Sequence, residues 1–149
     1  MTRSALDRGS LDALQGTLAT EHAALWCYSL AVAFLPGDQL EQARRDEVAH
    51  RALRATLERM LAAAGVPAVS ALPAYAPPQP VTDGRSAAAL VVVAEGDTLA
   101  AWRSLIEHTS DRELRRTALG VLEDGTLRCA RWRTAVGTQP AIPPFPGRR

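Results

Sequence analysis

The sequence has no lysine and no asparagine, and arginine supplies all 17 of its basic residues. The 16 acidic residues nearly balance them, so the net charge is only +1. A nucleic-acid-binding domain usually carries a strong basic excess gathered on one face. The densest basic group here, Arg128, Arg131 and Arg133 around Trp132, is typical of a solvated helix instead. The charge balance therefore argues against nucleic acid as a partner.

Cysteines and long apolar runs are also scarce. Cys27 and Cys129 are too few to form a disulfide framework in 149 residues, and both lie in apolar stretches typical of core positions. The longest largely apolar run, residues 23–35, is too short to cross a membrane. The first residues lack the apolar segment of a signal peptide. These absences predict a cytoplasmic protein with no membrane contact.

Helical periodicity dominates what is present, and strand signals are almost absent. Apolar residues make up 47% of the chain and charged residues 22%, which is typical of one soluble globular domain. Breaks at Pro36-Gly37 and Gly65, together with expected capping boxes at Asp38 and Ser110, separate four helical patterns. Their predicted ranges are 10–35, 38–64, 86–108 and 110–136.

The connection between the second and third patterns, residues 65–85, is long and contains five prolines. An extended segment of this length can return along a whole helix, as the long crossover of a ferritin-like bundle does. The predicted fold is therefore an all-α, ferritin-like four-helix bundle that fills residues 1–149 as a single domain. The Pro-rich tail, residues 137–149, is expected to lie over the bundle with Ile142 and Phe145 as its anchors.

Glu47-x-x-His50 has the spacing that ferritin-like di-iron proteins use twice, together with two further lone glutamates. Glu21 and Glu95 each interrupt an otherwise apolar stripe, where a charge is costly unless it is paired or binds a metal. The fourth helix has no histidine and offers only Glu123 or Asp124 at the edge of its core stripe. The candidate ligands for Fe or Mn are Glu21, Glu47, His50, Glu95 and Glu123.

Several segments also carry a family resemblance. TEHAALWCYSLA (residues 20–31), AHRALRATL (49–57), LPAYAPPQPVTD (72–83), RCARWR (128–133) and PPFPG (143–147) resemble a family of small, Ala-rich ferritin-like domains of unknown function from high-GC bacteria. The resemblance covers nearly the whole chain and implies a ferritin-like bundle without an assigned activity. It implies that the typical positions are Glu21, His22, His50, Glu95 and an acid at Glu123 or Asp124.

Three functional hypotheses follow from these residues. The first is a bundle that has lost the complete di-iron site and acts as a non-catalytic interaction module, with a second copy of the chain as its expected partner in a homodimer. In that case Arg54, Asp46 or Tyr28 would hold Glu21, His50 and Glu95 in a polar network. The second is a reduced Fe or Mn site. The third is a small-molecule pocket between the helices, lined by Trp26, Tyr28, Trp102 and Trp132.

The two remaining histidines are not expected to be ligands. His22 is predicted at the surface or boundary of the bundle, with the rim of a site beside Glu21 as the alternative. His108 is predicted at the end of the third helix, where an imidazolium would interact favourably with the helix dipole.

Overall fold

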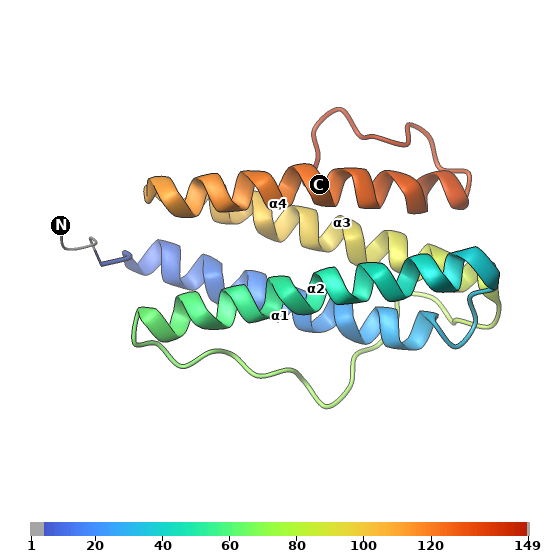
Figure 1. Ribbon diagram of the computed structural model, residues 1–149, viewed down its shortest axis with the longest axis horizontal. Helices are drawn as coiled ribbons and strands as arrows, with labels where there is room; N and C mark the ends of the chain where they lie inside the picture. Colours follow the sequence, from blue (N-terminus) through green and yellow to red (C-terminus); the bar gives the residue numbers. More distant parts are fainter. Residues whose placement is uncertain (1–4, 149) are drawn as a thin grey trace.

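The computed structural model describes residues 5–148 and folds them into four long helices without a strand in that range (Figure 1). α1 packs against both α2 and α3, and α3 also packs against α4, whereas α2 and α4 have little backbone contact. The all-α four-helix prediction is confirmed. The helices are α1 (Arg8–Ala31), α2 (Gly37–Ala63), α3 (Gly84–His108) and α4 (Arg112–Ala135).

The connections give the helices an up, down, down, up order (Figure 1). Short turns join α1 to α2 and α3 to α4, whereas residues 64–83 run along the outside of the bundle from one end to the other. Gln15 on α1 holds this crossover by accepting a hydrogen bond from the Val69 amide and donating one to the Pro67 carbonyl. This is the connectivity of a ferritin-like bundle with one long crossover.

Two of the expected helix starts are wrong. α2 begins at Gly37 after Pro36, whose side chain cannot cap, so Asp38 lies inside the first turn and forms no capping box. The cap of α4 is Asp111 and not Ser110, because the Asp111 carboxylate accepts a hydrogen bond from the Leu114 amide. The helix that does have a capping box is α3, where the Asp83 and Ser86 side chains each bond the other's backbone.

The apolar core is divided into two clusters at different heights of the bundle. Between them, a band of buried polar side chains crosses the bundle at mid-height, and it forms the site described below. The first cluster comprises Leu14, Leu18, Leu57, Leu61, Trp102, Leu105, Leu114 and Ala118. The second comprises Tyr28, Ala31, Leu35, Ala43, Ala87, Ala88, Val91 and Trp132.

The C-terminal tail is held by its backbone and not by the expected apolar anchors. Ile142 and Phe145 are 52% and 60% exposed, so the prediction that they anchor the tail is wrong. Arg133 donates two hydrogen bonds to the Pro140 carbonyl. Gly147, with a φ of +78°, brings the end of the tail so close to α3 that an added Cβ would lie 2.6 Å from the Leu99 carbonyl oxygen. The tail therefore depends on donors from the bundle and on one glycine.

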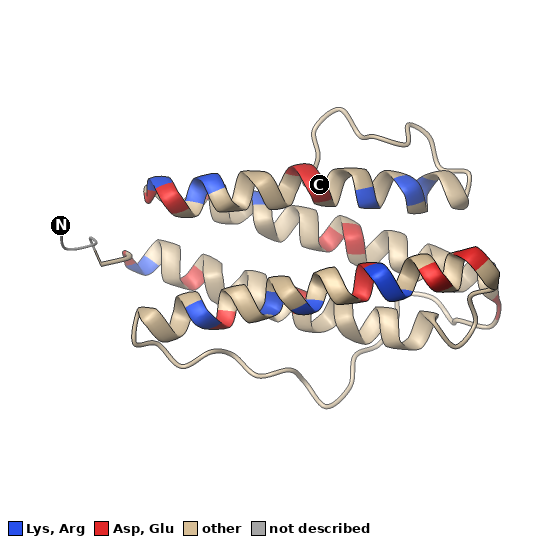
Figure 2. Cartoon of the chain, viewed as in Figure 1, with Lys and Arg blue, Asp and Glu red and all other residues tan. Residues whose placement is uncertain are grey.

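The charged residues lie mostly away from this core. Acidic and basic side chains are interspersed along α2 and α4, without a large region of one sign (Figure 2). None of the described helices is long and apolar enough to cross a membrane.

Candidate functional site

Each helix contributes one charged side chain to the middle of the bundle. These four residues, Glu21 on α1, His50 on α2, Glu95 on α3 and Arg128 on α4, are called the core charge network here. Glu21, His50 and Glu95 are completely buried, and Arg128 is 8% exposed. Burying charges is costly unless they are paired and hydrogen-bonded, so the contacts among them decide what the site can do.

His50 links the two carboxylates across the bundle. Its Nδ1 lies 2.6 Å from Glu21 Oε2, and its Nε2 lies 2.7 Å from Glu95 Oε1. A carboxylate can only accept a hydrogen bond, so both ring nitrogens act as donors, and only the protonated imidazolium has two N–H groups. The geometry therefore favours a positively charged His50.

Glu95 is the most heavily bonded member of the network. Its carboxylate accepts hydrogen bonds from the Tyr28 hydroxyl at 2.6 Å and from His50. The Nε of Arg128 lies 3.0 Å from both of its oxygens. On the other side, Glu21 Oε1 accepts a hydrogen bond of 2.7 Å from the Trp102 indole. Both buried carboxylates are thus held by donors from other helices.

A third buried acid lies one turn before His50, outside the core charge network. Asp46 is 3% exposed and accepts hydrogen bonds from the Trp132 indole at 2.8 Å and from Gln42 at 2.8 Å. Arg131 lies 3.4 Å from Asp46 Oδ1, the oxygen that Gln42 also bonds. The Trp132 contact joins α2 to α4, on the side of the bundle where the two backbones hardly meet.

The protonation states follow from these contacts. Burial alone would lower the pKa of His50, but the hydrogen bonds to Glu21 and Glu95 and their negative charges raise it to about 9. Burial opposes ionisation of Glu95, yet His50, Arg128 and Tyr28 together hold its pKa below the ordinary value. The pKa of Arg128 is raised, since the charge of Glu95 outweighs the effect of burial. Glu95 therefore faces two cations, His50 and Arg128.

Gly125 explains how Arg128 reaches inward. Side chains on a helix lean towards its N-terminus, so the Arg128 guanidinium passes over the residue one turn earlier. A Cβ on Gly125 would lie 3.4 Å from an Arg128 terminal nitrogen and 3.0 Å from a Leu99 methyl group. The fourth helix of a di-iron bundle carries Glu and His at this three-residue spacing. In this chain Gly125 and Arg128 have that spacing, and a cation enters the core in place of two metal ligands.

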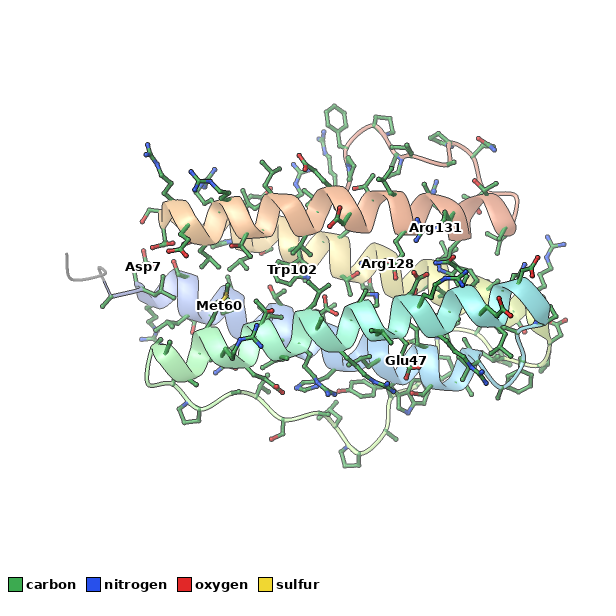
Figure 3. All side chains as sticks on the ribbon, viewed as in Figure 1. Asp7, Glu47, Met60, Trp102, Arg128 and Arg131 are labelled. Atoms are coloured by element: carbon green, nitrogen blue, oxygen red, sulfur yellow. The ribbon has the colours of Figure 1, made fainter. Side chains whose placement is uncertain are left out.

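The candidate ligands from the sequence are only partly brought together. Glu21, His50 and Glu95 meet in the network, whereas Glu47 forms a 2.7 Å ion pair with Arg51 and Glu123 is exposed. Figure 3 shows Arg128 and Trp102 between the α2 and α4 ribbons, with Glu47 on the far side of α2.

The residues expected to hold the network also differ from those that do. Tyr28 does so, as expected. Arg54 does not, and Asp46 bonds Trp132 and not the ring of His50, whose two nitrogens are already engaged.

The residue that sequence reasoning missed is Arg128. The signal was its position between Gly125 and Trp132, where it interrupts the core stripe of the fourth helix as Glu21 and Glu95 interrupt theirs. The three arginines of the RCARWR segment do not form one surface group, because Arg128 turns inward, Arg131 approaches Asp46 and Arg133 holds the tail.

The arrangement does not fit a di-iron centre. A histidine ligand must present a neutral nitrogen lone pair to the metal, whereas both His50 nitrogens donate to carboxylates. Arg128 places a fixed cation against both oxygens of Glu95. Within residues 5–148, no group of three or more His, Cys, Asp or Glu side chains has an arrangement that could hold a metal ion.

The aromatic residues proposed to line a pocket serve mainly as core. Tyr28, Trp102 and Trp132 are at most 2% exposed, and each uses its polar atom on a buried carboxylate. Trp26 differs, because it is only partly buried and lies outside the network, 5.9 Å from the ring of Tyr75 in the crossover.

The histidines outside the network have structural contacts. His22 is 8% exposed and therefore more buried than predicted, since its Nε2 lies 3.0 Å from the Val69 carbonyl of the crossover. His108 lies in the last turn of α3, where its Nδ1 is 2.8 Å from the Ser104 carbonyl.

Comparisons with known proteins identify the family and the fold. Residues 13–149 match the model of a family described as a domain of unknown function, DUF4439. No curated protein matches the chain. A conserved hypothetical protein from Mycobacterium tuberculosis has a similar crystal structure, with 31% identity and a TM-score of 0.82 over 85% of this chain and 96% of that one.

A second solved structure is described as ferritin like, diiron-carboxylate proteins from Bacillus anthracis str. Ames. It has a TM-score of 0.76 over 87% of this chain and 99% of that one, but only 14% identity. At that identity the likeness shows the ferritin-like fold alone.

Proposed function

Since the chain belongs to the DUF4439 family of domains of unknown function, we propose its role from its own core: a metal-free ferritin-like bundle that acts as a binding module and not as a di-iron oxidase. The observation that carries this proposal is Arg128. Its guanidinium lies against Glu95 and supplies the positive charge that a metal ion would otherwise bring to the carboxylates. The protein then keeps the fold and its buried acids without needing a metal to neutralise them.

Metal content tests this proposal directly. The protein is purified without chelator, loaded anaerobically with Fe(II) or Mn(II), desalted and measured by mass spectrometry. We expect well under one equivalent of either metal, and no change of Tm on addition of metal. Retention of one or two equivalents that are lost in Glu21→Gln would overturn the proposal and favour the alternative of a reduced Fe or Mn site.

The variant Arg128→Glu is the matched counterpart, because it is expected to gain the metal binding that the wild type lacks. It removes the cation and adds a carboxylate beside Glu21, His50 and Glu95, which makes a set of oxygen and nitrogen donors suited to Fe or Mn. We expect this variant to be less stable than the wild type without metal and to recover stability when Mn(II) is added. Equal metal binding by both proteins would show that Arg128 does not determine metal exclusion.

Self-association is part of the same proposal. Leu119 and Leu127 are 50% and 56% exposed two turns apart on α4, so they lie on one outer face of the bundle. A homodimer through this face would cover them. Light scattering after size exclusion should give twice the chain mass for the wild type and the chain mass for Leu119→Glu.

A further inference from the structure

A separate pocket of about 230 Å³ lies beneath the crossover, between α1 and α2. It contains none of the four residues of the core charge network. Its wall combines aromatic rings with charged side chains, contributed by His22, Trp26, Glu47, Arg51, Arg54 and Tyr75. Ligand pockets typically have this composition, with apolar surface and a few convergent polar groups.

Trp26 and Tyr75 form the aromatic part of the wall. Their ring centroids are 5.9 Å apart with the planes tilted by 52°, and both rings are partly exposed. The chain has only seven aromatic residues by its counts of Trp, Tyr and Phe, so two partly exposed rings in one pocket are notable. Tyr75 is held in place because its hydroxyl accepts a hydrogen bond from the Leu72 amide.

The charges in the pocket are unevenly paired. Arg51 is neutralised by Glu47 at 2.7 Å. Arg54 has only a looser ion pair: the Glu58 carboxylate lies 4.0 Å from its Nε, beyond hydrogen-bond length. Among the described residues, Arg54 Nε is the buried side-chain nitrogen that lacks a hydrogen-bond partner. Buried polar atoms usually have a hydrogen-bond partner, so Arg54 Nε is a donor that an incoming acceptor could use.

The pocket is already formed before any ligand enters. The buried His22 donates from Nε2 to the Val69 carbonyl, and Gln15 bonds the Val69 amide and the Pro67 carbonyl. These contacts hold the crossover against α1 on the side next to Trp26. A preformed site does not need to order a loop on binding, which lowers the cost of association.

We propose that this pocket binds a small aromatic carboxylate, with its ring against Trp26 and Tyr75 and its carboxylate on the Arg54 guanidinium. The volume is below the range of about 300–1,000 Å³ for drug-sized ligands, which favours a single ring. One loosely paired arginine, Arg54, beside the carboxylate of Glu47 favours a monoanion over a phosphate dianion. The proposal is independent of the metal question, because no network residue contributes to this site.

Benzoate is the probe that tests it, with benzamide and acetate as comparison ligands. Benzamide keeps the ring without the charge, and acetate keeps the charge without the ring. The readout is the three indole N–H signals of Trp26, Trp102 and Trp132 in an NMR titration of the full chain. We expect benzoate to shift the Trp26 signal saturably and to leave the two buried indoles unchanged, since these donate to carboxylates.

Two variants make the test specific. Arg54→Gln removes the charged donor, and the loss of one charge-assisted hydrogen bond should weaken benzoate binding roughly tenfold or more. Arg59→Gln is the matched control, because Arg59 lies on the same helix, is exposed and does not line the pocket. The proposal is overturned if benzoate shifts no signal saturably, if benzamide binds equally well, or if Arg54→Gln binds as the wild type does.

Discussion

Arg128 sets the chemistry of the core, because its removal would leave Glu95 buried with less positive charge around it. Breaking a buried ion pair by removing one partner typically costs about 3–5 kcal/mol. We expect Arg128→Met to lower the free energy of unfolding by roughly this amount in a urea titration. Arg131→Met is the control, since that side chain is 53% exposed and should cost less than about 1 kcal/mol. Similar losses for both variants would contradict the assigned importance of Arg128.

Because of His50, the free energy of unfolding should fall as the pH rises into the alkaline range. Its folded-state pKa of about 9 lies above the ordinary value of 6.5, so its contribution is complete below pH 6.5 and disappears as the pH rises through 9. The full loss is on the order of 3 kcal/mol, measured as the fall in the free energy of unfolding. In His50→Gln this part of the pH dependence should vanish. A flat wild-type curve over the same range would show that His50 is neutral in the folded protein.

Because of Glu95, the free energy of unfolding should fall at acidic pH. Its pKa is lowered in the folded protein, so its contribution is present above the ordinary value of 4.5 and is lost as the pH falls through the folded value. Unfolding free energies measured from neutral pH downwards should therefore decline below about pH 4.5. Glu95→Gln should be less stable at neutral pH and show a shallower decline in acid.

At this scale the sequence located three of the four network residues. Glu21, His50 and Glu95 could be predicted because each interrupts an apolar stripe of its own helix. The sequence could not show that Asp46 is buried and Glu47 is not, since both lie within one turn of His50. The contact that turns Asp46 inward comes from Trp132 on another helix. Arg128 was assigned to the surface because its burial depends on Glu95, 33 residues away in the chain.

Among the elements, the start of α3 depends on a side-chain cap and the start of α2 does not. Asp83→Ala removes the carboxylate that accepts from the Ser86 amide, which should cost about 1 kcal/mol of unfolding free energy. Asp38→Ala should cost only about 0.3–1 kcal/mol, because Asp38 contributes through the helix dipole alone. Thermal melts of the two variants measure the difference, and a larger loss for Asp38→Ala would reverse the assignment.

The position of the tail depends on Gly147, and a second glycine, Gly137, provides a control for the effect of backbone strain. Gly147 and Gly137 both have positive φ values, +78° and +74°, so alanine is strained at either position. Only at Gly147 would the new Cβ also collide with the α3 backbone. We expect Gly147→Ala to free the tail for cleavage by a protease, with Gly137→Ala much less affected. Equal cleavage of both variants would mean that close packing against Leu99 does not hold the tail.

Helix positions followed well from the sequence, but helix ends did not. Periodicity identified all four helices, because each must bury one stripe of apolar residues. The exact starts differed where Pro36 displaced an expected cap and where Asp111 was preferred to Ser110. The tail was misassigned because its contacts are made by backbone carbonyls, which no side-chain pattern reveals.

For the whole molecule, connectivity was the most informative feature of the sequence. Five prolines in one connection indicated a crossover along the bundle, and this distinguishes the ferritin-like order from a simple up-down-up-down bundle. What connectivity could not indicate is the choice between a metal and an arginine at the centre. That choice depends on how four helices place their side chains at one height.

The pairing within the core charge network also divides the chain into two halves. Glu21 and His50 belong to the α1–α2 hairpin, and Glu95 and Arg128 belong to the α3–α4 hairpin, so each hairpin contains one acid and one base. Within the network, each hairpin therefore carries its own acid and base, whereas Asp46, which is buried on α2, finds Trp132 and Arg131 on α4. The bonds from Tyr28 and His50 to Glu95, and from Trp102 to Glu21, then join the halves. Two fragments separated after Tyr75 should therefore recognise each other and reassemble without a covalent link, as complementary pieces of one protein.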